Sequence, residues 1–131
     1  GRNFQDNPLT AEEAAVIGHP LSQGITEAEA YYLLDNEIEK IVKALDKRLS
    51  WWRDIDDERQ FVLLDMAYQM GVDGLLTFQN TLRFIKEGYY LKAADNLLKS
   101  KYAKQTPGRA NDNANCLRTG EWIYGSKKKD S

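Results

Sequence analysis

The sequence predicts a mainly α-helical fold, and three observations support this. Two Thr-x-x-Glu capping boxes, at residues 10–13 and 26–29, mark helix starts, because the hydroxyl and the carboxylate satisfy amide groups that a helix start leaves without partners. Apolar residues recur at helical spacing, and no stretch shows sustained two-residue alternation. Since 131 residues fall in the range of one domain, we expect a single hydrophobic core.

The first two helices are predicted from the capping boxes. The first is expected to be short, because Gly18 and Pro20 interrupt it. The second is expected to run from Thr26 to Leu49 along one apolar stripe, formed by Leu34, Ile38, Ile41, Leu45 and Leu49. At 1.5 Å per residue this helix would be roughly 30–35 Å long, about the diameter of a small domain. We therefore predict a strut that joins two lobes.

A third helix is predicted from Asp57 to Met70, capped by Asp56 or Asp57 and ending at Gly71. It is apolar nearly all round, so it belongs in the centre of the fold. Three more helices are expected over residues 75–86, 91–100 and 107–118. In the last of these, Thr106 is the expected N-cap and Pro107 takes the first-turn position.

Composition excludes several classes of protein. The net charge of −2 gives no general attraction to nucleic acid, and the absence of a basic recognition helix disfavours a DNA-binding module. The apolar runs are far shorter than the ~20 residues of a membrane span. Cys116 is the only cysteine and His19 the only histidine, so we expect neither a disulfide framework nor a metal or other cofactor. The lysines at 127–129 are expected to form a solubilising tail.

Two polar residues interrupt the predicted central helix. Asp65 and Gln69 are four residues apart, so they share one face. Either this face meets a ligand, for which an amide offers the donors and acceptor that sugars need, or Asp65 pairs with an arginine and Gln69 bonds a neighbouring segment. Nearby aromatic residues could similarly form the walls of a cleft or belong to the core. These aromatic residues are Tyr68, Phe78, Tyr89, Tyr90 and Tyr102.

The carboxylates do not reveal a catalytic pair. Glycosidases need two carboxyls in contrasting environments, one with a raised pKa and one ionised. The glutamates near the capping boxes instead have capping roles, and the acidic residues at 54–58 favour a helix start. The glutamates concerned are Glu12, Glu13, Glu27 and Glu29. No pair of carboxylates stands out from the sequence.

Four motifs, in order and spacing, resemble the phage-type lysozymes. They are AYQMG at 67–71, GLLTFQNTL at 74–82, QTPGRA at 105–110 and RTGEW at 118–122. The segment at 24–30 is also similar to the start of the family's long interlobe helix. The resemblance implies a lysozyme-like α+β fold with most of its N-terminal β lobe missing from this chain. Residues 1–25 would be the remnant of that lobe, 26–49 the interlobe helix, 50–124 the helical C-terminal lobe and 125–131 a tail.

The resemblance also implies a muramidase that cleaves the β-1,4 bond between N-acetylmuramic acid and N-acetylglucosamine in bacterial peptidoglycan. Carried over position by position, the saccharide contacts would be Asn3, Tyr68, Gln69, Thr81, Asn96 and Tyr102. Tyr102 stands where the family often has a tryptophan packed on the glutamine. Arg109 and Trp122 are expected to be structural, since they would position the C-terminal helices.

One departure from the family concerns catalysis. The family's general-acid glutamate, with an aspartate and a threonine, precedes a glycine motif that resembles residues 1–3 here. No catalytic residue can therefore be assigned within the chain, and the acid is expected upstream of Gly1. We expect a monomer made in the cytoplasm of a bacterial host that acts on the cell wall, inactive unless the upstream segment joins it. The alternative is a helical module that binds peptidoglycan or a partner without cutting.

Overall fold

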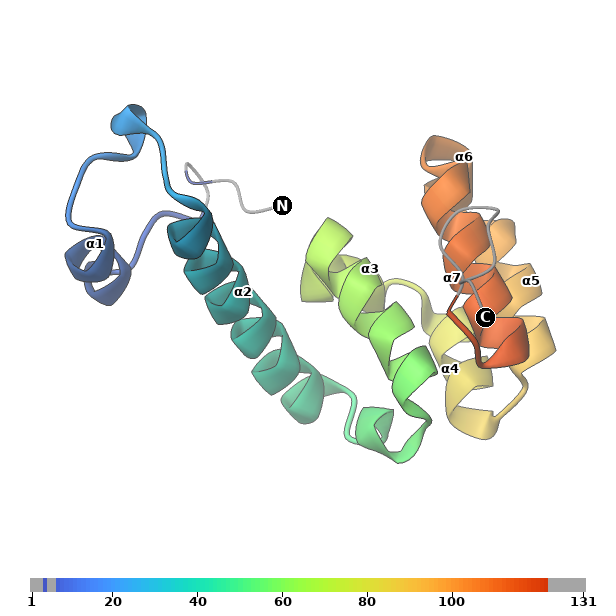
Figure 1. The fold of residues 1–131 in the computed structure, drawn as a ribbon. Helices are drawn as coiled ribbons and strands as arrows, with labels where there is room; N and C mark the ends of the chain where they lie inside the picture. The colour runs from blue at the N-terminus through green and yellow to red at the C-terminus, as the bar shows by residue number, and fades with distance from the viewer. Residues whose placement is uncertain (1–3, 5–6, 123–131) are drawn as a thin grey trace.

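A computed structural model describes residue 4 and residues 7–122 of the chain. Its elements are α1 (Ala11–Ile17), η1 (Leu21–Gln23), α2 (Glu27–Arg48), η2 (Trp52–Asp54), α3 (Asp57–Leu76), α4 (Gln79–Glu87), α5 (Tyr90–Leu98), α6 (Lys101–Gln105) and α7 (Pro107–Thr119). This part of the chain contains no β-strand, which confirms the mainly α-helical prediction (Figure 1). Within the same residues, no helix is both long and apolar enough to cross a membrane.

Both predicted capping boxes are present at the starts of α1 and α2. The Thr10 hydroxyl accepts from the Glu13 amide, and the Glu13 carboxylate accepts from the Thr10 amide at 2.9 Å. Thr26 and Glu29 make the same reciprocal pair at the start of α2. Each box satisfies two amide groups that the helix start leaves without partners. Both predicted helix starts are therefore confirmed.

The apolar stripe of α2 is buried only towards its C-terminal end. Leu45 is fully buried and Leu49 nearly so, whereas Ile38 is 39% exposed. Leu33, which is not part of the predicted stripe, is buried instead. The physical reason is visible in Figure 1, where α2 and α3 meet near the η2 turn and diverge from it. The predicted helix is confirmed, and its apolar stripe is fully covered only at the C-terminal end.

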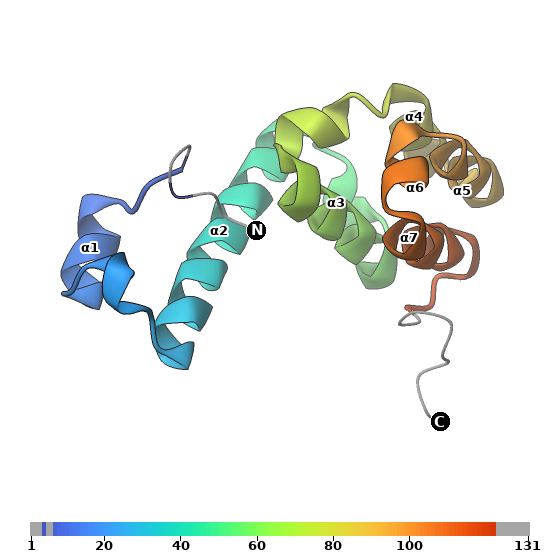
Figure 2. The same ribbon diagram turned by 90° about the horizontal axis from the view of Figure 1, so that it is seen from above.

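Helix α3 lies between α2 and the helices α4 to α7 (Figure 2). It packs against α2 and against α7, so its predicted central place is confirmed. Gly71 breaks its geometry with φ 80° and ψ 158°, values that glycine adopts without the cost other residues pay, so the predicted end of the central helix at Gly71 is confirmed. A further helical segment runs to Leu76 and α4 begins only at Gln79, so the predicted start of the next helix at Leu75 was wrong. Phe61 is exposed, so α3 is not apolar on every side.

The helices α4 to α7 pack against one another. Helix α5 packs against α4 and α7, and α7 also packs against α6. The short α6 was not predicted, because five residues are too few for a periodic pattern. Thr106 does occupy the N-cap of α7, but its hydroxyl donates to the Tyr102 carbonyl at 3.0 Å and makes no cap hydrogen bond. The prediction that the Thr106 side chain caps α7 was therefore wrong, whereas the predicted place of Pro107 at the helix start is confirmed.

We call the helices α3 to α7 the lobe. The hydrophobic core lies between these helices and the end of α2. Its fully buried larger side chains include Leu45, Val62, Leu63, Met66, Leu75, Ile85, Leu97 and Leu117. Burial of this apolar surface is the dominant favourable term in folding. The helices from α3 onwards therefore share one core.

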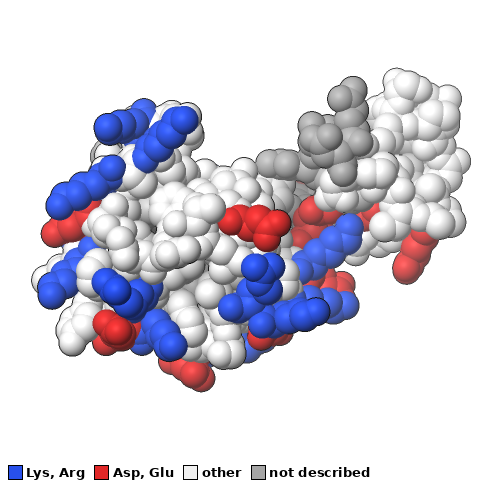
Figure 3. Space-filling view, turned by 180° about the vertical axis from the view of Figure 1, so that it is seen from behind, with Lys and Arg blue, Asp and Glu red and all other residues white. Residues whose placement is uncertain are grey.

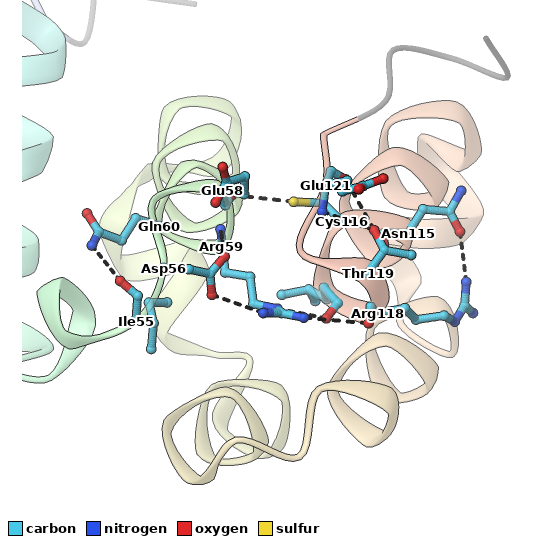
Figure 4. A network of polar contacts seen from close by, with 11 residues as sticks. Ile55, Asp56, Glu58, Arg59, Gln60, Asn115, Cys116, Arg118, Thr119 and Glu121 are labelled. Carbon is cyan, nitrogen blue, oxygen red and sulfur yellow. Dashed lines mark hydrogen bonds and ion pairs between the residues drawn. The ribbon is translucent and has the colours of Figure 1, made fainter. Parts of the chain in front are cut away.

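Arg59 locks the start of α3 to the end of α7 (Figure 4). Its guanidinium donates to the Leu117 carbonyl at 2.9 Å, pairs with Asp56 at 3.0 Å and lies 3.6 Å from the centre of the Tyr90 ring. The carbonyls that end a helix lack partners within it, so a buried arginine there is stabilising. These contacts hold α7 against α3. Polar residues of the candidate site come from both helices.

Candidate functional site

An open cleft of about 680 Å³ lies between the end of α3 and the segments α4 to α6. Its lining combines amide, hydroxyl, aromatic and lysine side chains, including Phe78, Gln79, Asn80, Asn96, Lys99, Lys101, Tyr102 and Gln105. None of its twelve lining residues is an Asp or a Glu. The size and lining are those of a site for a small polar ligand such as a sugar.

A buried polar network supports one wall of this cleft. Gln69 donates through Nε2 to Oδ2 of Asp65 at 2.6 Å, and the Tyr102 hydroxyl donates to Oε1 of Gln69 at 3.3 Å. Nδ2 of Asn113 donates both to Oδ2 of Asp65, at 3.2 Å, and to the Tyr102 hydroxyl, at 3.1 Å. The network therefore connects α3, α6 and α7.

Asp65 also pairs with an arginine, as one of the two readings of the sequence proposed. The distance from Arg109 Nη1 to Asp65 Oδ1 is 3.7 Å, and the Asp65 side chain is only 10% exposed. Gln69 does not line the cleft; it reaches the cleft through Tyr102, which does. The ion pair of Arg109 with Asp65 connects α7 to α3, which agrees with the structural role expected for Arg109.

Tyr102 is held in the wall by both packing and hydrogen bonds. Its ring makes an edge contact with Phe78, with ring centres 6.1 Å apart. Burial raises the pKa of the Tyr102 hydroxyl above its usual value, and its hydrogen bonds with Gln69 and Asn113 oppose that rise only in part. The hydroxyl therefore stays protonated and can keep donating to Gln69.

Thr81 and Asn96 form a second polar pair beside the cleft. The Thr81 hydroxyl donates to Oδ1 of Asn96 at 2.5 Å, and Thr81 itself is buried. Asn96 lines the cleft, whereas Thr81 lies behind it. The pair fixes the Asn96 amide with its oxygen towards Thr81 of α4, and within the described part of the chain its amide nitrogen makes no hydrogen bond.

Two expected contacts lie elsewhere. Tyr68 lines a separate, smaller cavity with Phe4, Ile25 and residues of α2. Asn3 lies outside the described residues. The structure thus brings Gln69, Thr81, Asn96 and Tyr102 to one side of the molecule and places Tyr68 apart from them.

The other aromatic residues divide between the two roles that the sequence left open. Phe78 lines the cleft. Tyr90 packs beneath Arg59, and Tyr89 is exposed beside Lys92. Trp122 packs edge-on against Phe61 with ring centres 4.8 Å apart, which agrees with its expected structural role.

Three carboxylates outside the cleft, those of Glu13, Glu29 and Asp46, have structural partners. Glu13 is buried, and its two oxygens accept from the Thr10 amide and from Nδ2 of Asn36. Hydrogen bonds from the Thr26 backbone and His19 lower the pKa of Glu29, and those from Arg53 and Trp52 lower the pKa of Asp46. Both shifts are opposite to those of a general acid. No group of three His, Cys, Asp or Glu among the described residues is placed to hold a metal ion.

The sequence reading missed several cleft residues, including Gln79, Asn80, Lys99, Lys101 and Gln105, and it also missed Asn113 in the network behind the cleft. Asn113 is fully buried, and its Oδ1 has no hydrogen-bond partner within the described part of the chain. A signal was available, because Ala110, Asn113, Ala114 and Leu117 share the spacing of one buried helix face. An asparagine on such a face must find polar partners, and those partners are Asp65 and Tyr102.

Comparison with known proteins identifies lysozymes among the relatives of this chain. It is 28% identical over 121 residues to "Probable T4-type lysozyme 1" of Dictyostelium discoideum, covering 86% of this chain and 70% of that protein. A second Dictyostelium protein of the same type is 32% identical over 69 residues, or 53% of this chain and 41% of that protein. The pre-baseplate central spike protein Gp5 of Enterobacteria phage T4 is 30% identical over 106 residues, 80% of this chain.

Two of these relatives are matched over less than half of their own length. No family model matches the chain. The chain spans 41% of the second Dictyostelium protein and 18% of the phage spike protein, so it corresponds to part of those relatives. The match to the first covers most of this chain, including the helices that build the cleft. On this evidence the chain is a homologue of the phage-type lysozymes.

Proposed function

We propose that the chain is the glycan-binding helical part of a muramidase that hydrolyses the β-1,4 bond between N-acetylmuramic acid and N-acetylglucosamine of bacterial peptidoglycan. The observation that carries the proposal is that Asn96 and Tyr102, two positions implied by the lysozyme resemblance, line one cleft. Thr81 and Gln69 lie directly behind them and hydrogen-bond to them. The lysozyme names of the relatives support the same activity.

The cleft suits a sugar chain for chemical reasons. The amides of Gln79, Asn80 and Asn96 offer donors and acceptors to hydroxyl and N-acetyl groups. Phe78 and Tyr102 supply apolar faces against which the rings of a glycan can pack. Lys99 and Lys101 add positive charge at the edge, and Figure 3 shows Lys and Arg gathered over the side that holds α4 to α7.

Bond cleavage requires an acid that the cleft does not contain. Protonating the leaving oxygen takes a carboxylic acid within hydrogen-bond reach, and the residues that line the cleft include no carboxylate. We therefore assign no catalytic role to a described residue.

Binding is tested by replacing a cleft amide. Asn96→Ala should weaken the affinity for a chitooligosaccharide roughly two- to tenfold, since a hydrogen bond between neutral groups contributes ~0.5–1.5 kcal/mol. Asn111→Ala removes the same amide from an exposed position of α7 outside the cleft and should leave the affinity unchanged. Calorimetric titration measures both. Equal affinities for the two variants would contradict the proposed site.

Catalysis is tested by supplying the acid. The 131-residue chain alone should not clear a suspension of bacterial cell walls. Extended by a lysozyme N-terminal segment with its glutamate, it should clear the suspension, and the same extension with glutamine in that position should not. Clearing by the chain alone, with its mass confirmed, would overturn the assignment.

The absence of carboxylates from the cleft lining also favours a second candidate, a module that binds peptidoglycan without cutting it. The extended chain separates the two functions. Glycan binding without clearing by either extended form would favour the binding module.

A further inference from the structure

The buried network behind the cleft suggests a role for a residue that does not line it. Asp65 is on α3, is 10% exposed and is absent from the cleft lining, yet its carboxylate is bonded to three side chains. Oδ1 faces Arg109, and Oδ2 accepts from both Gln69 and Asn113. A buried charge with this many partners fixes the orientation of the groups around it.

The orientation of the two amides follows from the position of the negative charge. A carboxylate accepts hydrogen bonds and does not donate them, so Gln69 and Asn113 must both turn their nitrogens towards Oδ2. The bond from Gln69 is 2.6 Å, whereas the Tyr102 hydroxyl lies 3.3 Å from Gln69. Because charge-assisted hydrogen bonds are the shorter and stronger kind, Asp65 rather than Tyr102 decides how Gln69 is turned.

Once turned, the two amides hold Tyr102. The Gln69 carbonyl oxygen accepts a hydrogen bond from the Tyr102 hydroxyl, and Asn113 donates an N–H to the hydroxyl oxygen of Tyr102. The hydroxyl thus has one acceptor and one donor, which sets its rotation. With Phe78 against the edge of the ring, the side chain has a single place in the cleft wall.

We propose that Asp65 is a positioning residue, which fixes Tyr102 as a wall of the glycan cleft through Gln69 and Asn113. The inference rests on the proposed function, because the cleft must bind a glycan for the positioning to be felt. It requires that the effect of Asp65 on affinity passes through the Tyr102 hydroxyl.

A double-mutant cycle on the affinity for tri-N-acetylchitotriose tests this. Asp65→Ala and Tyr102→Phe should each weaken binding roughly two- to tenfold, the loss of one or two hydrogen bonds. Together they should weaken it no more than either alone, because both break the same chain of contacts. Asp73→Ala, which removes an exposed carboxylate from the same helix, should leave affinity unchanged.

Two further measurements separate positioning from general stability. Asp65→Asn retains an oxygen for the two amides and should keep most of the affinity even where the melting temperature falls with the lost Arg109 pair. The side-chain amide resonances of Gln69 should move in Asp65→Ala without ligand, since they lose a carboxylate partner.

The outcomes are distinguishable. Losses of affinity that multiply in the double variant would overturn the inference, as would unchanged Gln69 resonances in Asp65→Ala. Failure of the unmodified chain to bind the trisaccharide would instead contradict the proposed function itself.

Discussion

The N-terminal part of the molecule, through α2, and the lobe from α3 to α7 are built differently. Between residues 7 and 48, only Glu13, Ile17, Leu33 and Leu45 are buried, whereas the lobe contains most of the core. Charge differs as well. Residues 57–119 carry nine Lys or Arg against seven Asp or Glu, whereas residues 7–48 carry four against eight.

The two parts are consequently stabilised by different forces. The lobe contains most of the apolar core, which also includes Leu45 and Leu49 at the end of α2, so its stability follows mainly from packing. The segment from α1 to α2 depends on polar contacts near its surface: two capping boxes, the bond from Asn36 to Glu13 and the pair of His19 with Glu29. Exposed polar contacts contribute little each, so we expect this segment to open before the lobe unfolds.

A core truncation in the lobe should have the largest effect. Leu63→Ala is expected to lower the free energy of unfolding by about 2–5 kcal/mol, because Leu63 is fully buried and its removal leaves a cavity. Ile38→Ala, on the exposed face of α2, should change it by less than about 0.5 kcal/mol. Urea unfolding of both variants measures the difference. Comparable losses would show that the lobe is not the more tightly packed part.

The lone cysteine reports on the lobe. Burial raises the pKa of the Cys116 thiol to about 11, from a usual value of 9.0. Its thiolate fraction near neutral pH is therefore about a hundredfold lower than that of an exposed thiol, before steric protection is counted. Iodoacetamide should label it slowly in the folded protein and faster in Leu63→Ala. Rapid labelling of the unmodified protein would contradict a closed lobe.

Loss of a helix cap should affect only the N-terminal part. Thr26→Ala removes the side-chain acceptor of the α2 capping box, at an expected cost of about 0.5–2 kcal/mol to that helix. Hydrogen exchange should speed up in the first turns of α2, while α3 to α7 and the labelling rate of Cys116 stay as they were. A uniform acceleration across both parts would mean that they unfold as one unit.

The smallest effect is a pH dependence at the start of α2. Hydrogen bonds to the Pro20 carbonyl and to Glu29 raise the pKa of His19 above 6.5, so its stabilising contribution is complete below 6.5 and is lost as pH rises through the raised value. The lowered pKa of Glu29 means that its contribution is present above 4.5 and is lost as pH falls through the lowered value. Amide shifts of residues 18–29 should follow the His19 titration. A His19 pKa at or below 6.5 would contradict the pair.

Much of the fold could be predicted from local sequence signals. The capping boxes, the position of Pro107 and the helical spacing of apolar residues located α1, α2, α3 and α7. The errors arose where tertiary packing decides the outcome. Ile38 has the right spacing to be buried but is exposed, because the spacing of apolar residues along one helix does not show which of its turns another helix covers. Thr106 stands at the N-cap, but its hydroxyl turns back to Tyr102.

The candidate site was predictable to a lesser degree. The i, i+4 pair of Asp65 and Gln69 marked the polar face of α3, and the lysozyme resemblance added Asn96 and Tyr102. Sequence spacing within one helix could not show that Asn113, 48 residues beyond Asp65, completes the network. Nor could it show that Tyr68 lines a different cavity, together with residues of α2.

The central claim is that the lobe, and not the α1 to α2 segment, holds the glycan. The most direct test is a titration of the ¹⁵N-labelled chain with tri-N-acetylchitotriose, followed by amide chemical shifts. The account predicts saturable shifts around Asn96, Tyr102 and the start of α4, with none in α1. Shifts confined to α1 and α2, or no shifts near Asn96 and Tyr102 at saturating ligand, would contradict it.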